Sequence, residues 1–114
     1  APLIPSQLQR VCKRAALGMA RTGAISTHGS GDLVLAFANG YRLHRYNIAE
    51  ERFAAMLSGR WMSVLYQGVV EATEEAILNS LTMAYTMTGR DGNTIHALPL
   101  DRLVEVMRAH GRLK

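Results

Sequence analysis

The chain has 114 residues and a net charge of +4 at pH 7, and 48% of its residues are hydrophobic. This length and composition predict a single domain over residues 1–114 with a substantial apolar core. No apolar run approaches the roughly 18 residues that cross a bilayer, and the basic groups are not interleaved with aromatic residues that stack on bases. We therefore expect neither a membrane nor a nucleic acid as a partner.

Two features bear on where the protein works and whether the chain is whole. The single cysteine, Cys12, cannot form an internal disulfide and fits a reducing compartment. We therefore expect a cytoplasmic protein, with the periplasm left open. The sequence begins with Ala1-Pro2 rather than Met, and we expect it to be processed, truncated or part of a longer protein.

The first predicted element is an amphipathic helix that Ser6 caps after Pro5 and that Gly23 ends. Apolar residues recur at helical spacing on one face, and the opposite face is polar and basic. We expect the basic face to lie in water or to attract an acidic partner chain. The apolar face comprises Leu8, Val11, Cys12, Ala15 and Met19, and the basic face comprises Gln9, Arg10, Lys13 and Arg14.

A continuous apolar run over residues 33–38 predicts a strand that is covered on both faces. Asn39-Gly40, directly after it, is a strong hairpin signal. Residues 41–46 are either the returning strand or an irregular loop.

The central part of the chain is predicted to be helical. Asn47 can cap a helical region over residues 48–57, which Ser58-Gly59 interrupts. A longer helix follows over residues 62–84. More than half of its circumference is apolar, so we expect it to be largely buried.

The last part of the chain reads as turn, strand and helix. Residues 88–93 are rich in Gly, Asp and Asn and predict a turn before a short strand over residues 94–98. A final helix is opened by Pro99 and Asp101 and closed by Gly111. The complete order predicts an α/β layered domain. The chain has only two or three strands of its own, and because two isolated strands cannot form the centre of a stable sheet, we expect another chain to supply the missing strands.

The most informative feature is the turn Gly29-Ser30-Gly31-Asp32 directly before the apolar strand. Residues two apart on an extended chain point to the same side, so the Ser30 hydroxyl and the Asp32 carboxylate are expected to share one side. This arrangement predicts a small polar site at the mouth of a buried sheet. The alternative is an ordinary loop entering a core strand, since Gly, Ser and Asp are common turn residues.

Other candidate residues have simpler interpretations. The Gly-Ser-Gly spacing does not match a nucleophile elbow, so Ser30 is interpreted as a supporting hydroxyl. The histidines have no metal-ligand spacing, and only His28 is near enough to Ser30 in the sequence to line a site. Glu71, Glu74 and Glu75 are interpreted as a solvated helix face rather than an acid/base pair. No metal and no cofactor is expected.

Several sequence blocks, taken together and in order, resemble one family. They are Ala-Pro-Leu-Ile-Pro at 1–5, Arg-Thr-Gly at 21–23, Gly-Ser-Gly-Asp at 29–32, Leu-Ala-Phe at 35–37, Gly-Val-Val-Glu-Ala-Thr-Glu-Glu-Ala-Ile-Leu-Asn at 68–79, Met-Thr-Gly-Arg-Asp-Gly at 87–92 and Ala-Leu-Pro at 97–99. The chain looks like the carboxy-terminal (β) chain of the L-aminopeptidase/D-amidase/D-esterase family. That family includes the β-peptidyl aminopeptidases and is related to nylon-oligomer hydrolases. Only residues 39–61 match poorly.

The resemblance implies an α/β fold that is part of a four-layer αββα sandwich, like that of amino-terminal-nucleophile hydrolases, completed by a second chain. It implies a precursor that cuts itself into α and β chains, with the new amino-terminal Ser or Thr of the β chain as the nucleophile. It also implies an α chain from the same precursor as partner and assembly of the heterodimers, typically as tetramers. The implied reaction releases amino-terminal residues from small peptides, amides or esters through an acyl-enzyme.

The resemblance also implies roles for residues of this chain. Ser30 would hydrogen-bond and orient the nucleophile, and Asp32 would hold Ser30 and stabilise the nucleophile's ammonium group. In the family, an apolar strand of about nine residues, roughly 30 Å when extended, begins with the nucleophile and precedes Ala-Pro-Leu. Ala1 has no hydroxyl, so we expect the nucleophile upstream of Ala1, or else an inactive chain. The oxyanion donors and the pocket for the substrate amine are expected on the α chain.

Two other functions remain open at this point. A related self-processing acyltransferase, such as ornithine acetyltransferase, would share the fold and transfer acetyl groups, although the blocks above favour the aminopeptidase. A non-catalytic assembly subunit is compatible with the lack of a nucleophile at Ala1. The preference for α- or β-amino acids, and for the D or L form, depends on pocket walls outside this chain.

Overall fold

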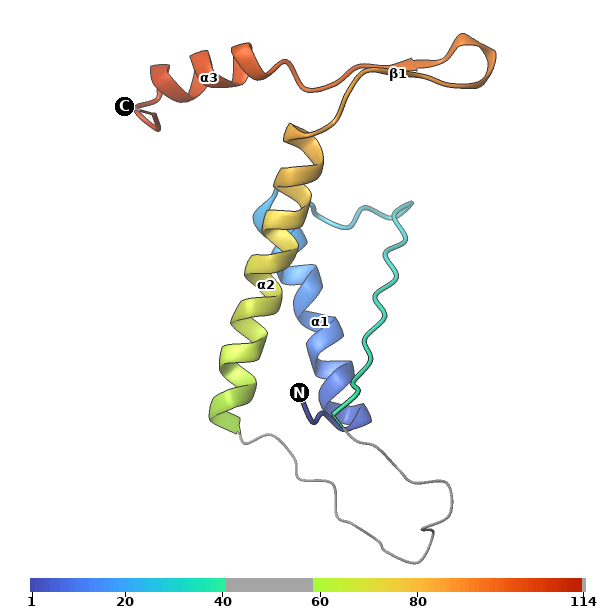
Figure 1. The fold of residues 1–114 in the computed structure, drawn as a ribbon, viewed down its shortest axis with the longest axis vertical. Coiled ribbons are helices and arrows are strands. Elements are labelled where there is room, and N and C mark those ends of the chain that lie inside the picture. The colour runs from blue at the N-terminus through green and yellow to red at the C-terminus, as the bar shows by residue number, and fades with distance from the viewer. Residues whose placement is uncertain (41–58, 114) are drawn as a thin grey trace, which may run out of the picture. The chain divides into compact units, whose positions relative to one another are not determined.

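The computed structural model describes residues 1–40 and 59–113. In chain order its elements are α1 (Pro5–Arg21), α2 (Gly59–Thr82), β1 (Met87–Thr88), the 3-10 turn η1 (Arg90–Gly92), β2 (Thr94–Ile95) and α3 (Leu100–Ala109) (Figure 1). Contacts group these residues into two compact units, Ala1–Glu74 and Glu75–Lys114. The single domain over residues 1–114 stays a prediction. The proposed return strand over 41–46 and the helical region over 48–57 lie outside the described residues.

In the first unit, α1 begins at Pro5 with Ile4 as its N-cap, two residues before the predicted cap at Ser6. Pro5 occupies the first helical position, where its missing N–H costs no hydrogen bond. The Ile4 carbonyl accepts hydrogen bonds from the Gln7 and Leu8 amides at 2.9 and 3.0 Å, and the Ile4 N–H donates to Gln7 Oε1 at 3.3 Å. Ser6 therefore lies inside the helix. The prediction that Ser6 caps it is wrong, because Pro5 and Gln7 already complete the first turn.

The helices α1 and α2 run in the same direction along their contact. The guanidinium carbons of Arg10 and Arg14 lie 5.7 and 4.2 Å from the centroid of the Tyr66 ring. Further along both helices, Gly18 approaches the Val70 carbonyl so closely that a Cβ there would lie 2.5 Å from its oxygen. The basic face of α1 was predicted to lie in water or to attract an acidic partner. Part of it instead packs on α2, because a guanidinium group is attracted to the face of an aromatic ring.

Few side chains are buried within the described chain. The buried apolar residues there are Leu3, Ala15 and Met62. The long helix is confirmed, but apolar side chains such as Val64 and Leu78 are exposed, contrary to the prediction that it is largely buried. The physical reason is that a helix with apolar residues around more than half its circumference needs several packing partners, and residues 1–40 and 83–113 contribute too few.

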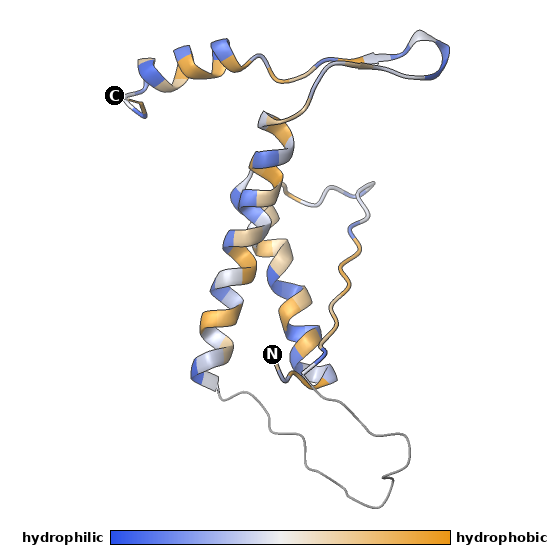
Figure 2. Cartoon of the chain, in the orientation of Figure 1, coloured by the Kyte–Doolittle hydropathy of each residue, from blue (hydrophilic) through white to orange (hydrophobic). Residues whose placement is uncertain are grey.

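Residues 33–40 form what we call the extended segment, which follows the Gly-Ser-Gly-Asp turn (Figure 1). Leu33, Leu35 and Phe37 are 100%, 90% and 84% exposed, whereas Ala36 and Ala38 are half-buried. Figure 2 shows this stretch as a hydrophobic run. The burial has the period of two that is typical of a strand, yet no described residue pairs with the segment in a ladder. The predicted strand over 33–38 is therefore extended and unpaired here, with its apolar face open.

The second unit contains a short antiparallel hairpin. Its paired residues are Met87 with Ile95 and Thr88 with Thr94, and the two threonine hydroxyls lie 2.8 Å apart. The turn between them confirms the prediction for residues 88–93, and Asp91 there has a φ of 58°. The second strand ends at Ile95 rather than at residue 98.

The last helix, α3, matches its prediction. It begins directly after Pro99, carries Asp101 in its first turn, where a carboxylate is favourable at a helix N-terminus, and is followed by Gly111 at a φ of 65°. On its surface, Arg102 Nη1 and Glu105 Oε2 form an exposed pair at 3.4 Å. None of the described helices has the length and apolar character needed to span a bilayer.

Candidate functional site

Ser30 and Asp32 lie on the loop that joins α1 to the extended segment. The Ser30 N–H donates a hydrogen bond to the Thr27 carbonyl at 2.8 Å, which closes a turn immediately before the pair. Both side chains are exposed. Neither forms a hydrogen bond or ion pair with any residue in the described ranges. The hydroxyl and the carboxylate are therefore available to groups that other parts of the protein or a substrate supply.

The start of this loop is fixed by the C-terminal end of α1. The Thr22 hydroxyl donates to the Met19 carbonyl at 2.7 Å, and the Gly23 and Ala24 amides donate to the Ala20 and Met19 carbonyls at 3.1 and 3.3 Å. Gly23 has a φ of 95°, a left-handed conformation that glycine adopts at little cost. The structure thus confirms Gly23 as the residue that stops the helix.

The loop also holds one residue in an unfavourable conformation. Ser26 has a φ of 47°, and a non-glycine residue in the left-handed region costs on the order of 1 kcal/mol. Such backbone strain is often found at functional sites, where the surrounding structure over-determines it.

The far end of the extended segment returns to the beginning of the chain. A Cβ built on Gly40 would lie 2.7 Å from both the nitrogen and the Cα of Pro2, so these two backbones touch. The sequence signal at Asn39-Gly40 was interpreted as a hairpin, and the residues that would follow it lie outside the described ranges. What the structure adds is that the Gly40 end of the extended segment lies against the start of the chain.

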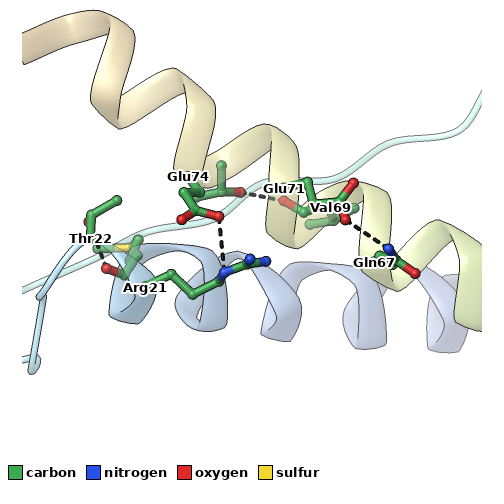
Figure 3. Close-up of polar contacts among 8 residues, drawn as sticks. Arg21, Thr22, Gln67, Val69, Glu71 and Glu74 are labelled. Carbon is green, nitrogen blue, oxygen red and sulfur yellow. Dashed lines mark hydrogen bonds and ion pairs between the residues drawn. The ribbon is translucent and has the colours of Figure 1, made fainter. Parts of the chain in front are cut away.

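The glutamates of α2 do not form an acid/base pair. Glu71 accepts a hydrogen bond from Gln67 Nε2 at 2.8 Å and is exposed, as is Glu75. The prediction of a solvated face therefore holds for these two. Glu74 differs, because its Oε2 lies 3.0 Å from Arg21 Nε and its side chain is only 28% exposed (Figure 3).

The histidines form no site in the described part of the chain. His28, His96 and His110 are exposed, and His44 lies outside the described residues. Across residues 1–40 and 59–113, no cluster of three or more His, Cys, Asp or Glu side chains is arranged to hold a metal.

Sequence reasoning missed two features next to the candidate site. One is the ion pair between Arg21 and Glu74, and the other is the close approach of α2 to Gly18. Neither follows from helical periodicity, which gives no information on which residues of two helices meet. The available signal was that Arg21 and Glu74 both fall in blocks that carry the family resemblance.

Comparison with known proteins identifies the family of the chain. The model of peptidase family S58 matches residues 1–95. The β-peptidyl aminopeptidase BapA of Sphingosinicella xenopeptidilytica is 38% identical over 112 residues, which is 96% of this chain and 27% of that protein. The chain thus spans about a quarter of the length of this curated relative.

Solved structures of similar proteins superpose on nearly the whole chain. The PH0078 protein of Pyrococcus horikoshii OT3 superposes with a TM-score of 0.88 at 45% identity, over 99% of this chain and 32% of that one. The L-aminopeptidase D-Ala-esterase/amidase of Ochrobactrum anthropi, described as a variant of the Ntn hydrolase fold, superposes with a TM-score of 0.85 at 31% identity, over 99% and 32%. The family match over most of the chain decides the assignment: this chain belongs to peptidase family S58.

Proposed function

We propose that the chain is the carboxy-terminal portion of a self-cleaved aminopeptidase. This enzyme releases amino-terminal residues from peptides, amides or esters through an acyl-enzyme. The observation that carries the proposal is the Ser30–Asp32 pair, exposed and without a described partner, on a loop that starts at the hydrogen-bonded end of α1 and leads into a segment that ends against Pro2. A polar pair held in this way supports chemistry performed on a group that arrives from elsewhere in the protein.

The nucleophile of this enzyme would be a Ser or Thr on a strand that leads into Ala1. In support, Gly40 touches Pro2, so such a strand would end beside the end of the extended segment. Because α1 connects the upstream strand to the extended segment, these two strands would form a parallel pair with a helical crossover. Residues 31–40 span roughly 30 Å, the same length as a strand of about nine residues. This register would bring the first residue of that strand level with Ser30 and Asp32.

The chemistry assigns a role to each group. The α-amino group of the nucleophile, with an ordinary pKa of about 7.7–8.0, accepts the hydroxyl proton as the oxygen attacks the substrate carbonyl. The bond to the leaving amine or alcohol then breaks, the leaving group takes that proton, and an ester remains on the enzyme. Water hydrolyses the ester and restores the hydroxyl. Ser30 orients the attacking oxygen, and Asp32 holds Ser30 and stabilises the ammonium group.

The remainder of the protein supplies what this chain lacks. We infer that strands from the α chain of the same precursor cover the open face of Leu33, Leu35 and Phe37. A fully exposed run of large apolar side chains next to unpaired backbone is unfavourable in water. The α chain would also provide oxyanion donors and the amine pocket, and the heterodimers would assemble into a larger oligomer in the bacterial cytoplasm.

The proposal is tested on the full-length protein with aminoacyl p-nitroanilides of L-, D- and β-amino acids. Ser30→Ala and Asp32→Asn should each lower kcat by about 10²-fold, since removing a group that positions or stabilises the reacting atoms has effects of this size. Ser80→Ala, which removes an exposed hydroxyl on α2, is the matched control and should leave kcat unchanged. No release from any of these substrates by the wild-type protein would count against an aminopeptidase. Acetyl transfer to ornithine in its place would identify the acyltransferase.

A further inference from the structure

The C-terminal end of α1, from which the loop with Ser30 and Asp32 starts, is joined to α2 by an ion pair. Arg21 Nε lies 3.0 Å from Glu74 Oε2, with the two side chains 52% and 28% exposed. Figure 3 shows the Arg21 side chain reaching from α1 across to Glu74 on α2. A partly exposed pair of this kind contributes little to stability, so its importance would have to come from the geometry that it fixes.

The pair lies beside the closest contact between the two helices. A Cβ on Gly18 would lie 2.6 Å from Thr73 Cβ, so α1 touches α2 one turn before Arg21. Lateral movement of α1 is limited there by backbone contact. Rotation of the last turn about this contact is limited by Arg21, whose guanidinium group is held by Glu74. The end of α1 is thus fixed at two points.

Arg21 is also directly connected to the loop that carries Ser30 and Asp32. The next residues, Thr22 and Gly23, are hydrogen-bonded to the last turn of α1, so the end of the helix and the start of the loop move together. Beyond Ser26 with its φ of 47°, the loop closes in the turn that ends at Ser30. The last turn of α1 thus sets the position and direction from which the loop with Ser30 and Asp32 starts.

We propose that Arg21 and Glu74 are positioning residues: their ion pair sets the end of α1 on α2 and thereby aims Ser30 and Asp32 at the reacting group. The expected effect on catalysis rests on the proposed function, whereas the effect of the ion pair on the loop does not. Neither residue touches the substrate. A misplacement of about 1 Å at a reacting centre can cost up to 10²-fold in rate, so a weak ion pair can have a large effect on kcat.

The test compares charge reversals with their combination in the full-length protein. Arg21→Glu and Glu74→Arg should each lower kcat about tenfold, with KM within about twofold of the wild type, since neither residue contacts the substrate. The double variant, which restores the pair with its charges exchanged, should recover most of the lost activity. Arg21→Lys, which keeps the charge, should retain most of it as well. Arg102→Glu, which breaks the pair with Glu105 on α3, is the matched control and should leave kcat unchanged.

Hydrogen exchange separates failure of this inference from failure of the proposed function. Each single reversal should accelerate exchange of the hydrogen-bonded amides within residues 24–32, those of Ala24 and Ser30, and the double variant should slow it again, whether or not the protein cleaves any substrate. The inference is overturned if folded single variants keep wild-type kcat. It is equally overturned if exchange in 24–32 is unchanged, or if the double variant recovers neither kcat nor protection. If the wild type is inactive while exchange responds as described, the ion pair positions the loop and the proposed function fails alone.

Discussion

The contact at Gly18 allows a sharp test of how α1 and α2 pack. In Gly18→Ala the new Cβ would lie 2.5 Å from the Val70 carbonyl oxygen and 2.6 Å from Thr73 Cβ. Both atoms are fixed to helix backbone and neither can rotate away, so the helices must separate. Overpacking of this kind costs about 1–3 kcal/mol, and the higher helix propensity of Ala returns about 0.8–1 kcal/mol. Because the contact is with backbone, we expect a net loss of about 1–2 kcal/mol.

Gly68 provides the matched control, since it lies in α2 and a Cβ there would meet nothing within 4 Å. Gly68→Ala should therefore gain up to about 1 kcal/mol from helix propensity alone. The free energy of unfolding of both variants is measured by urea denaturation of the full-length protein, followed by circular dichroism. If Gly18→Ala is as stable as Gly68→Ala, the close approach of the two helices at Gly18 is refuted.

Three further outcomes are expected. Ser26→Val should lower the free energy of unfolding by about 1–2 kcal/mol relative to Ser26→Gly, because Ser26 has a φ of 47°. Equal stability of the two variants in urea would show that the left-handed conformation is not required. Tyr66→Leu should lower the free energy of unfolding by about 0.5–1 kcal/mol more than the lost packing alone, since the Arg14 guanidinium carbon lies 4.2 Å from the ring centroid. A double-mutant cycle with Arg14→Gln that gives no coupling would contradict this contact. Leu35→Asp should prevent assembly of the full-length protein although Leu35 is 90% exposed in this chain; normal assembly by size-exclusion chromatography would argue against a covering strand.

Much of the fold was predictable from local signals. Gly23 and Gly111 marked helix ends because a positive φ suits glycine, and both have one. The turn over residues 88–93 followed from its Gly, Asp and Asn content. The N-cap of α1 was misplaced at Ser6, since proline at the first helical position competes with a serine cap.

Features that depend on contacts between distant residues were not predictable. Helical spacing placed Arg10 and Arg14 on a polar face but could not show that Tyr66 packs beneath them. The Ser30–Asp32 turn was identified from its residues and its resemblance, whereas the anchoring of Gly40 on Pro2 could be found only in three dimensions. The extended segment pairs with no strand in residues 1–40 and 59–113; its apolar run predicted a covered strand but could not show what covers it.

The central claim is that Ser30 and Asp32 support a nucleophile that self-cleavage creates upstream of Ala1. Intact mass spectrometry of the full-length protein, before and after treatment with a serine-directed sulfonyl fluoride, tests it most directly. The account predicts two chains, with the smaller one beginning at a Ser or Thr shortly before Ala1 and carrying the label on that first residue. A single uncut chain with full peptidase activity, or a label on Ser30 itself, would contradict it.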